Sequence, residues 1–285
     1  MKKLSYVLLG LVILFFSCKQ EGNKMRRKWS NLEHADVNLW ADDYFHQNTV
    51  DASRVREGII RARVDGEWHD YKTVELPDKF IKWSVENRME TFERVRKNQM
   101  PRLAGPHNGM VATYGIRRLD SQFKINNAVK GMGFMPREDK IKEVIDLLES
   151  TKDSDFETHL KVLEDLYNHV DEYFTRKALL SLELYTTKEF ETHTFLNEMV
   201  NPAVSIVFLD IPSFEVKAIA QLIHPNDPQL TEYEKDIVHY ANLIHSYFHG
   251  KFTKTFIAVV YHVIEVYDNT PGRGGKGIRI MPPLP

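Results

Sequence analysis

The C-terminal part of the chain contains two histidines at a spacing that suits metal binding. His245 and His249 lie four residues apart in a stretch with helical periodicity, so both imidazoles project from the same side of the expected helix. Histidine pairs at this spacing hold zinc in HExxH enzymes, where a third ligand completes the site. Here that ligand would be His262, Glu265 or His224. One hypothesis is therefore a metal-dependent hydrolase with a transition metal such as zinc at His245, His249 and His262.

The residue that follows the first histidine argues against a metalloprotease. The order is His-Ser-Tyr-Phe-His, so Ser246 stands where the HExxH pattern has its catalytic glutamate. A structural role explains the pair better. His249 falls at the helix C-terminus, where a cationic imidazole gains about 0.3–1 kcal/mol from the helix dipole. We favour this structural interpretation and expect no cofactor.

A second group of polar residues alternates along the chain. Glu189, Glu191 and His193 would share one face if they lay on a strand. Such a face could bind a metal or carry out acid–base chemistry. An exposed polar surface is the interpretation that we favour, because alternation over so few residues is a weak constraint.

The helix expected at residues 231–249 must position the histidine pair, and its ends are well marked. Thr231 and Glu234 form a capping box, in which each residue satisfies a free backbone N–H of the other. Gly250 then suits a helix C-terminus. Apolar residues recur at helical spacing and predict the buried side, at Ile237, Ala241, Ile244 and Phe248.

The rest of the pattern predicts helices and strands that cluster instead of strictly alternating. Asp65-Gly66 between two alternating runs predicts a β-hairpin. Further helices are expected at 78–99, 138–148 and 156–174, and strands at 110–118, 178–185, 203–209, 214–223 and 256–267. This order favours an α+β fold with a largely antiparallel sheet and packed amphipathic helices. The glycine-rich segment 131–136 is expected to separate an N-terminal α+β subdomain, residues 36–135, from a C-terminal one, residues 136–285.

Residues 1–17 have the layout of a secretory signal peptide. Lys2 and Lys3 precede an apolar run from Leu4 to Phe16, and the small Ser17 precedes Cys18. The run is shorter than the roughly 18 apolar residues of a membrane-spanning helix. The sequence Phe-Phe-Ser-Cys resembles the lipobox of bacterial lipoproteins. The resemblance implies that Cys18 receives a diacylglyceryl group, with fatty acids such as palmitate, and becomes the acylated N-terminus. The alternative is a secreted protein in which this cysteine is incidental.

The residues after the lipobox bear on location. Residues 18–35 are polar and basic, and we expect them to form a tether between the lipid and the folded part. In lipoproteins of this kind, Asp after the lipidated cysteine specifies the inner membrane, whereas this chain has Lys19. The resemblance therefore implies a cell-envelope protein, lipid-anchored at Cys18, in the outer membrane rather than the inner one. Whether it faces the periplasm or the cell surface stays open.

Composition excludes several classes of function. Cys18 is the only cysteine, so the mature body has no disulfide, thiol nucleophile or iron–sulfur cluster. A hydrophobic content of 42% predicts a globular body, and a net charge of −2 gives no electrostatic case for nucleic acid. No GxSxG motif is present. We therefore expect a non-enzymatic binding module whose partner is an envelope protein or a small ligand. A toxin-neutralising or inhibitor lipoprotein fits the sequence as well.

Overall fold

The computed structural model describes residues 39–272 and 277–284, and it confirms an α+β fold. The predicted signal peptide, Cys18 and the predicted tether at 18–35 lie outside the described residues. The helical elements are η2 (Val55–Glu57), α3 (Asp78–Arg96), α4 (Ile141–Thr151), α5 (Phe156–Asn168), α6 (Val170–Tyr173), α7 (His193–Val200) and α8 (Glu232–His249). The strands are β1 (Val50–Asp51), β2 (Ile59–Val64), β3 (Glu67–Lys72), β4 (Asn108–Tyr114), β5 (Ile125–Gly131), β6 (Gly133–Pro136), β7 (Phe174–Glu183), β8 (Ala203–Phe208), β9 (Phe214–Ile223), β10 (Ile257–Asp268) and β11 (Ile278–Met281).

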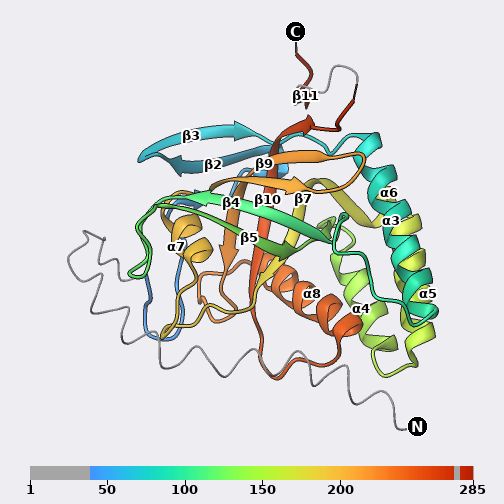
Figure 1. Cartoon of the computed structure of the whole chain (residues 1–285). Coiled ribbons are helices and arrows are strands. Elements are labelled where there is room, and N and C mark those ends of the chain that lie inside the picture. The colour runs from blue at the N-terminus through green and yellow to red at the C-terminus, as the bar shows by residue number, and fades with distance from the viewer. Residues whose placement is uncertain (1–38, 273–276, 285) are drawn as a thin grey trace.

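The predicted Asp-Gly hairpin joins β2 and β3. Asp65 and Gly66 have φ angles of 51° and 90°, the left-handed conformation that a two-residue hairpin turn requires. Together with β1, this hairpin forms a small sheet that lies across one face of the main sheet (Figure 1). Ile60 and Ala62 pack there against Ile219 of β9. The hairpin thus covers the outer side of the main sheet.

The main sheet is antiparallel and its two ends approach each other. Its strand order is β5-β4-β8-β9-β10-β7-β6, with β11 added to β10. β5 and β6 are separated only by Met132, yet they sit at opposite ends of this order. Gly133 of β6 pairs with Leu180 of β7. Three residues before Gly133, at the end of β5, Lys130 falls opposite Glu183 of β7, and these two side chains form an ion pair. The sheet therefore curls until β5 contacts β7.

Segment 131–136, which we expected to separate two subdomains, runs through the core instead. Phe134 and Met135 are buried in β6, which pairs with β7. Strands from residues 36–135 and from residues 136–285 therefore share one sheet and one main hydrophobic core. The two glycines serve close packing and a bend between strands, not a linker.

The helices lie mainly at one side of the curled sheet. α8 lies below the sheet, opposite the β2–β3 hairpin, and α3 and α5 stand side by side at its edge (Figure 1). α4 packs along α8, and α7 packs against β4, β5 and β9. The predicted capping box at the start of α8 is confirmed by reciprocal bonds between Thr231 and Glu234. Among the described helices, none has the length and apolar character needed to cross a bilayer.

Candidate functional site

The two histidines of the predicted pair lie on one side of α8 and line the same cavity. Their ring centroids are 5.6 Å apart. Burial lowers the pKa of His245 to about 4, and the nearby His249 contributes to the same shift. Burial also lowers the pKa of His249. Both imidazoles are therefore neutral at pH 7, and each has one N–H donor and one nitrogen lone pair.

The structure does not bring an expected third ligand to this pair. His262 lies on β10 and its Nε2–H donates to Gln221 Oε1 at 2.9 Å, so it lines a different hollow. His224 Nδ1 accepts the backbone N–H of Asn226 at 3.1 Å, and Glu265 pairs with two basic side chains. Across residues 39–272 and 277–284, no group of three or more His, Cys, Asp or Glu is arranged to hold a metal ion.

We therefore expect the purified protein, prepared without a histidine tag, to contain far less than one equivalent of any transition metal. Two neutral imidazoles without a third ligand form an incomplete site for zinc. Elemental analysis by mass spectrometry checks this, with the His245→Ala variant as the control for adventitious metal. Stoichiometric zinc that disappears in this variant would establish a metal site and revive the hydrolase hypothesis.

The polar group at residues 189–193 does not form the strand face that alternation suggested. Glu191 lies in a loop, where it accepts the indole N–H of Trp40 at 2.9 Å, and burial raises its pKa. His193 begins α7, and its Nε2–H donates to the backbone oxygen of Ile116 at 2.9 Å. Glu189 is exposed. Glu191 and His193 therefore hold a loop and a helix start in place, and the three residues do not converge.

The cavity beneath α8 is a largely apolar hollow beside the histidine pair, with a volume of about 370 Å³. This falls in the range of ~300–1,000 Å³ that is typical of small-molecule sites. α8 and α3 form its walls, and the bend between β5 and β6 forms its floor. Its apolar lining comes mainly from Phe92, Met132, Phe134, Leu163, Tyr167, Leu180, Tyr240, Ala241, Ile244 and Phe248.

One buried positive charge lies in this lining. Arg88 of α3 is only 8% exposed, and its guanidinium donates to the backbone oxygens of Met132 at 2.8 Å and Pro106 at 3.3 Å. Its Cζ lies 4.9 Å from the ring centroid of Tyr167 and 5.3 Å from that of Phe134. Sequence reasoning missed this residue. The available signal was its position four residues before Phe92, on the apolar side of the helix.

Two polar atoms in the cavity wall are buried without a hydrogen-bond partner. One is Ser181 Oγ on β7, and the other is Nδ1 of His107. His107 donates its Nε2–H to the backbone oxygen of Arg102 at 2.7 Å, so its Nδ1 is an acceptor, and burial lowers its pKa. Buried polar atoms are normally paired, and unpaired ones often mark a place for water or ligand.

The floor of the cavity approaches His245 closely at Gly131. A Cβ at this position would lie 3.5 Å from His245 Nε2 and 3.7 Å from its Cε1. A larger side chain would therefore fill the space in front of the imidazole. Glycine here keeps the N–H or lone pair of His245 accessible from the cavity.

The loop between α3 and β4 borders the cavity and carries apolar side chains into solvent. Met100 and Leu103 line the cavity but are 71% and 88% exposed. Backbone oxygens of this loop accept bonds from Arg94 and Asn108 at 3.0 and 2.8 Å, which hold it in position. Exposed apolar side chains beside an apolar cavity are suited to contact a ligand as it enters.

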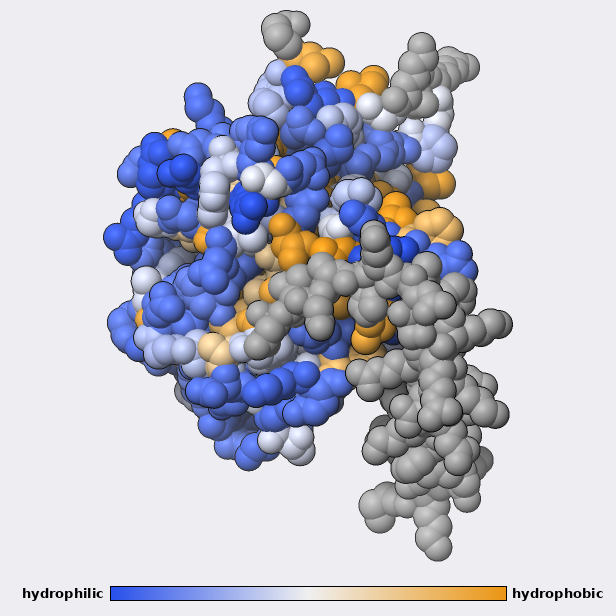
Figure 2. Space-filling model, turned by 90° about the vertical axis from the view of Figure 1, so that its left-hand side faces the viewer, coloured by the Kyte–Doolittle hydropathy of each residue, from blue (hydrophilic) through white to orange (hydrophobic). Residues whose placement is uncertain are grey.

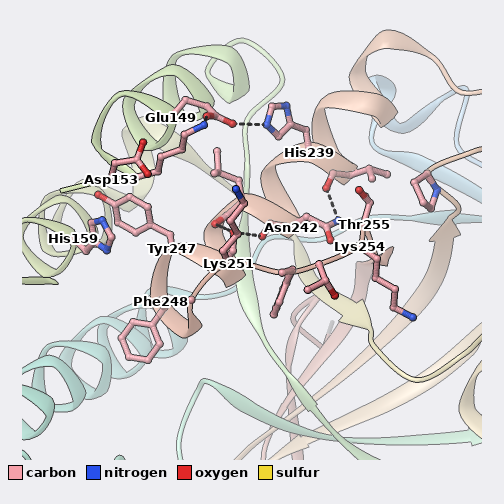
Figure 3. A pocket seen from close by; sticks show the side chains of 18 of the residues that line it. Glu149, Asp153, His159, His239, Asn242, Tyr247, Phe248, Lys251, Lys254 and Thr255 are labelled. Carbon is pink, nitrogen blue, oxygen red and sulfur yellow. Dashed lines mark hydrogen bonds and ion pairs between the residues drawn. The ribbon is translucent and has the colours of Figure 1, made fainter. Parts of the chain in front are cut away.

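A second, more open hollow of about 920 Å³ lies between α4, α8 and the segment that follows α8 (Figure 3). Several of its polar groups already have partners. His239 Nε2–H donates to Glu149 Oε1 at 2.9 Å, and the side chain of Asn242 bonds to both backbone groups of Phe256 at 2.7 and 3.0 Å. Phe248 lines this hollow as well as the cavity beneath α8. We regard the cavity beneath α8 as the better candidate site because two of its buried polar atoms, Ser181 Oγ and His107 Nδ1, lack partners.

Ionisable side chains are also buried beneath α7, where the ends of the sheet meet. Lys130 and Glu183 form an ion pair there, and Glu198 accepts the hydroxyl of Tyr261 at 3.2 Å. Glu198 is fully buried, which raises its pKa to about 8, and the nearby Glu183 adds to the shift while Lys130 opposes it. One lysine thus neutralises one of the two carboxyl groups, and the other keeps its proton at pH 7.

The turn of the β4–β5 hairpin carries exposed apolar side chains. Tyr114, Phe123 and Ile125 are each more than half exposed, and so is Val129 further along β5. This turn lies on the side of the molecule that faces the viewer in Figure 2, where apolar side chains gather within a largely hydrophilic surface. Surfaces of this kind commonly contact other proteins or lipid.

Comparison with known proteins gives little guidance. No family model matches the chain, and no curated protein matches it. Among solved structures, the crystal structure of an epitope-tagged form of HupZ from Group A Streptococcus aligns with a TM-score of 0.32 and 12% sequence identity, covering 65% of this chain and 94% of that one. A similarity this low carries no argument about fold or function.

Proposed function

We propose that this chain is a lipid-anchored protein of the cell envelope, most consistent with the outer membrane, whose folded part binds a small amphipathic molecule. The observation that carries the proposal is the cavity beneath α8. It combines an apolar lining with a few polar groups, Arg88, Ser181, His107 and His245. Small-molecule sites have this composition, in which apolar contacts supply affinity and a few polar groups fix orientation.

The polar groups of the cavity are suited to recognise a ligand. His245 and His249 are neutral at pH 7 and have no third metal ligand within the described residues. Ser181 and His107 have unpaired hydrogen-bonding atoms, which a ligand would satisfy. Each of these features supports recognition, and none requires a bond to be broken.

The proposed anchor adds a second reason for an amphipathic ligand. Residues 18–35 extend to roughly 60 Å at most, at ~3.3–3.6 Å per residue. A lipid on Cys18 would therefore hold the cavity close to a bilayer, where amphipathic molecules are concentrated. The polar part of such a ligand would form hydrogen bonds with the polar groups of the cavity. Its apolar part would pack against the phenylalanine and methionine side chains.

We expect the substitution Ala241→Leu to reduce binding of a neutral apolar probe at least tenfold. Ala241 is 1% exposed and lines the cavity, so three added carbons would occupy volume that the probe needs. The measurement is a fluorescence titration with N-phenyl-1-naphthylamine, whose emission rises in apolar surroundings. Circular dichroism and the melting temperature establish that the variant is folded.

The matched control is Ala112→Leu, the same chemical change on β4 at a half-buried position outside the cavity lining. It should bind the probe as the unaltered protein does. Equal loss in both variants, or no saturable binding by the unaltered protein, would reject the cavity as a binding site. An envelope protein as the partner would then be the better hypothesis, with the apolar β4–β5 turn as its contact surface.

A further inference from the structure

The charges around the cavity are unbalanced. Arg88 is ionised at any physiological pH. Within the described residues, no carboxylate forms an ion pair with it, and its polar contacts are neutral oxygens of Met132, Pro106 and Ser84. The described residues that line the cavity include no aspartate or glutamate.

The other basic groups at the cavity do not change this balance. Arg102 lies at the mouth, but its guanidinium pairs with Asp210 at 3.0 Å and Glu90 at 3.4 Å. His107, His245 and His249 all have pKa values lowered by burial. The cavity therefore presents one uncompensated positive charge, almost wholly removed from water, among neutral and apolar neighbours.

Such a charge attracts an anion much more strongly than an exposed one does, because little solvent screens it. Contacts with the rings of Phe134 and Tyr167 stabilise the guanidinium in part but leave it without a counter-charge. Ser181 Oγ has no partner and can donate to an anionic oxygen. The neutral imidazole of His245 can donate one N–H as well.

We propose that the ligand of this cavity is an amphipathic carboxylate, such as a medium-chain fatty acid, whose anionic head pairs with Arg88. This inference rests on the proposed binding function and specifies its ligand class. The guanidinium supplies a charge-assisted hydrogen bond, Ser181 supplies a second donor, and the hydrocarbon part lies along Phe92, Ile244 and Phe248. A neutral ligand of the same shape would leave the charge of Arg88 unbalanced.

The test compares two ligands that differ only in the head group. Decanoate and 1-decanol are each titrated at pH 7.5 against protein loaded with N-phenyl-1-naphthylamine, and displacement of the probe is measured. We expect the acid to bind about tenfold to a hundredfold more tightly than the alcohol, as is typical of a hydrogen bond to a charged group in a buried site. Equal affinities would overturn the inference.

The variant Arg88→Gln should reduce the preference for the acid to about twofold or less, and Arg88→Lys should retain part of it. Arg56→Gln is the matched control, because Arg56 is largely exposed, pairs with Glu138 and lies outside the cavity lining. If Arg88→Gln fails to fold, Ser181→Ala replaces it and should lower acid binding severalfold. An acid preference that is unchanged in Arg88→Gln would overturn the role of Arg88. If only Ser181→Ala can be tested, acid binding equal to that of the unaltered protein would overturn the proposed head-group site.

The outcomes separate this inference from the function on which it rests. If neither the acid, the alcohol nor the probe binds, the proposed binding function fails. If both ligands bind with equal affinity and Ala241→Leu weakens both, the binding function stands and only the carboxylate assignment fails.

Discussion

Replacing Glu198 by glutamine is expected to stabilise the protein, relative to the unaltered chain, by several kcal/mol more at pH 8 than at pH 5. Burial raises the pKa of Glu198 from its usual 4.5 to about 8. Each pKa unit corresponds to about 1.4 kcal/mol, so a shift of this size corresponds to roughly 5 kcal/mol. Glutamine has nearly the shape of the protonated acid and still accepts the hydroxyl of Tyr261. Its amide nitrogen takes the place of Oε2, which has no hydrogen-bond partner within the described residues, and the resulting cost is the same at every pH. It lacks the charge that burial penalises.

The pH dependence of this effect has a definite sign. Between pH 4.5 and 8 the unfolded chain releases the Glu198 proton while the folded protein retains it. The unfolded state then binds fewer protons, so the free energy of unfolding falls with rising pH and levels off above pH 8. His245 and His262, with pKa values lowered to about 4, act in the opposite direction between pH 4 and 6.5. The difference between the variant and the unaltered protein isolates Glu198.

Urea unfolding at several pH values between 5 and 8.5 measures this difference. The two proteins should be closest in stability near pH 5 and should diverge as the pH rises. Glu183→Gln is the control, because it deprives the buried Lys130 of its counter-charge. That substitution should destabilise the protein, but by less than the roughly 3–5 kcal/mol of a broken buried pair, because Glu198 can then ionise beside Lys130. Parallel curves for Glu198→Gln and the unaltered protein would show that Glu198 is ionised in the folded state.

Local sequence signals predicted several elements of the fold, including the helix that carries the histidine pair. The capping box at Thr231 marked the first turn of α8, and four-residue spacing placed His245 and His249 on one side of it. Asp65-Gly66 predicted the β2–β3 hairpin, and the strand expected at 214–223 has the same bounds as β9. Each of these features depends on residues that are close together in the chain. The local sequence pattern is therefore enough to predict it.

Features that depend on distant residues could not be read from the sequence. Segment 131–136 looked like a linker because of its glycines, but it forms the bend that closes the sheet against β7. The contact between Lys130 and Glu183 joins residues far apart in the chain, which periodicity does not predict. The sequence suggests His262 as a third metal ligand because it lies on the strand that follows the helix. The register of β10 instead directs it toward Gln221.

Arg88 illustrates the same limit at the candidate site. Its spacing from Phe92 places it on the buried side of α3, but only the fold shows that no carboxylate accompanies it there within the described residues. The charge balance of a cavity depends on side chains from several elements. A charged residue on the apolar side of a helix therefore does not indicate a binding site by itself. The neighbouring elements must be placed first, because they determine whether a counter-charge is present.

Replacing Cys18 by alanine is expected to abolish incorporation of fatty acid into the protein. Cys18 lies outside the described residues, and the expectation rests on its position in a sequence that resembles a lipobox. It is the only thiol of the chain, so no other residue can form the thioether. Each buried CH₂ of an acyl chain contributes about 0.8 kcal/mol to membrane binding, and two chains are needed for stable anchoring. Cells are grown with an alkynyl fatty acid, and label is measured on the isolated protein.

The control moves the thiol by two positions, in the double variant Cys18→Ala, Gln20→Cys. This protein again has one cysteine, but the cysteine no longer follows Ser17, so it should remain unlabelled. Intact mass of the unaltered protein should correspond to a chain that begins at residue 18 and carries acyl groups. Label that persists in Cys18→Ala, or an unmodified Cys18 in the unaltered protein, would contradict the anchor. In that case the cavity would act in a freely diffusing protein, and its ligand would have to be sought among soluble carboxylates and not at a bilayer.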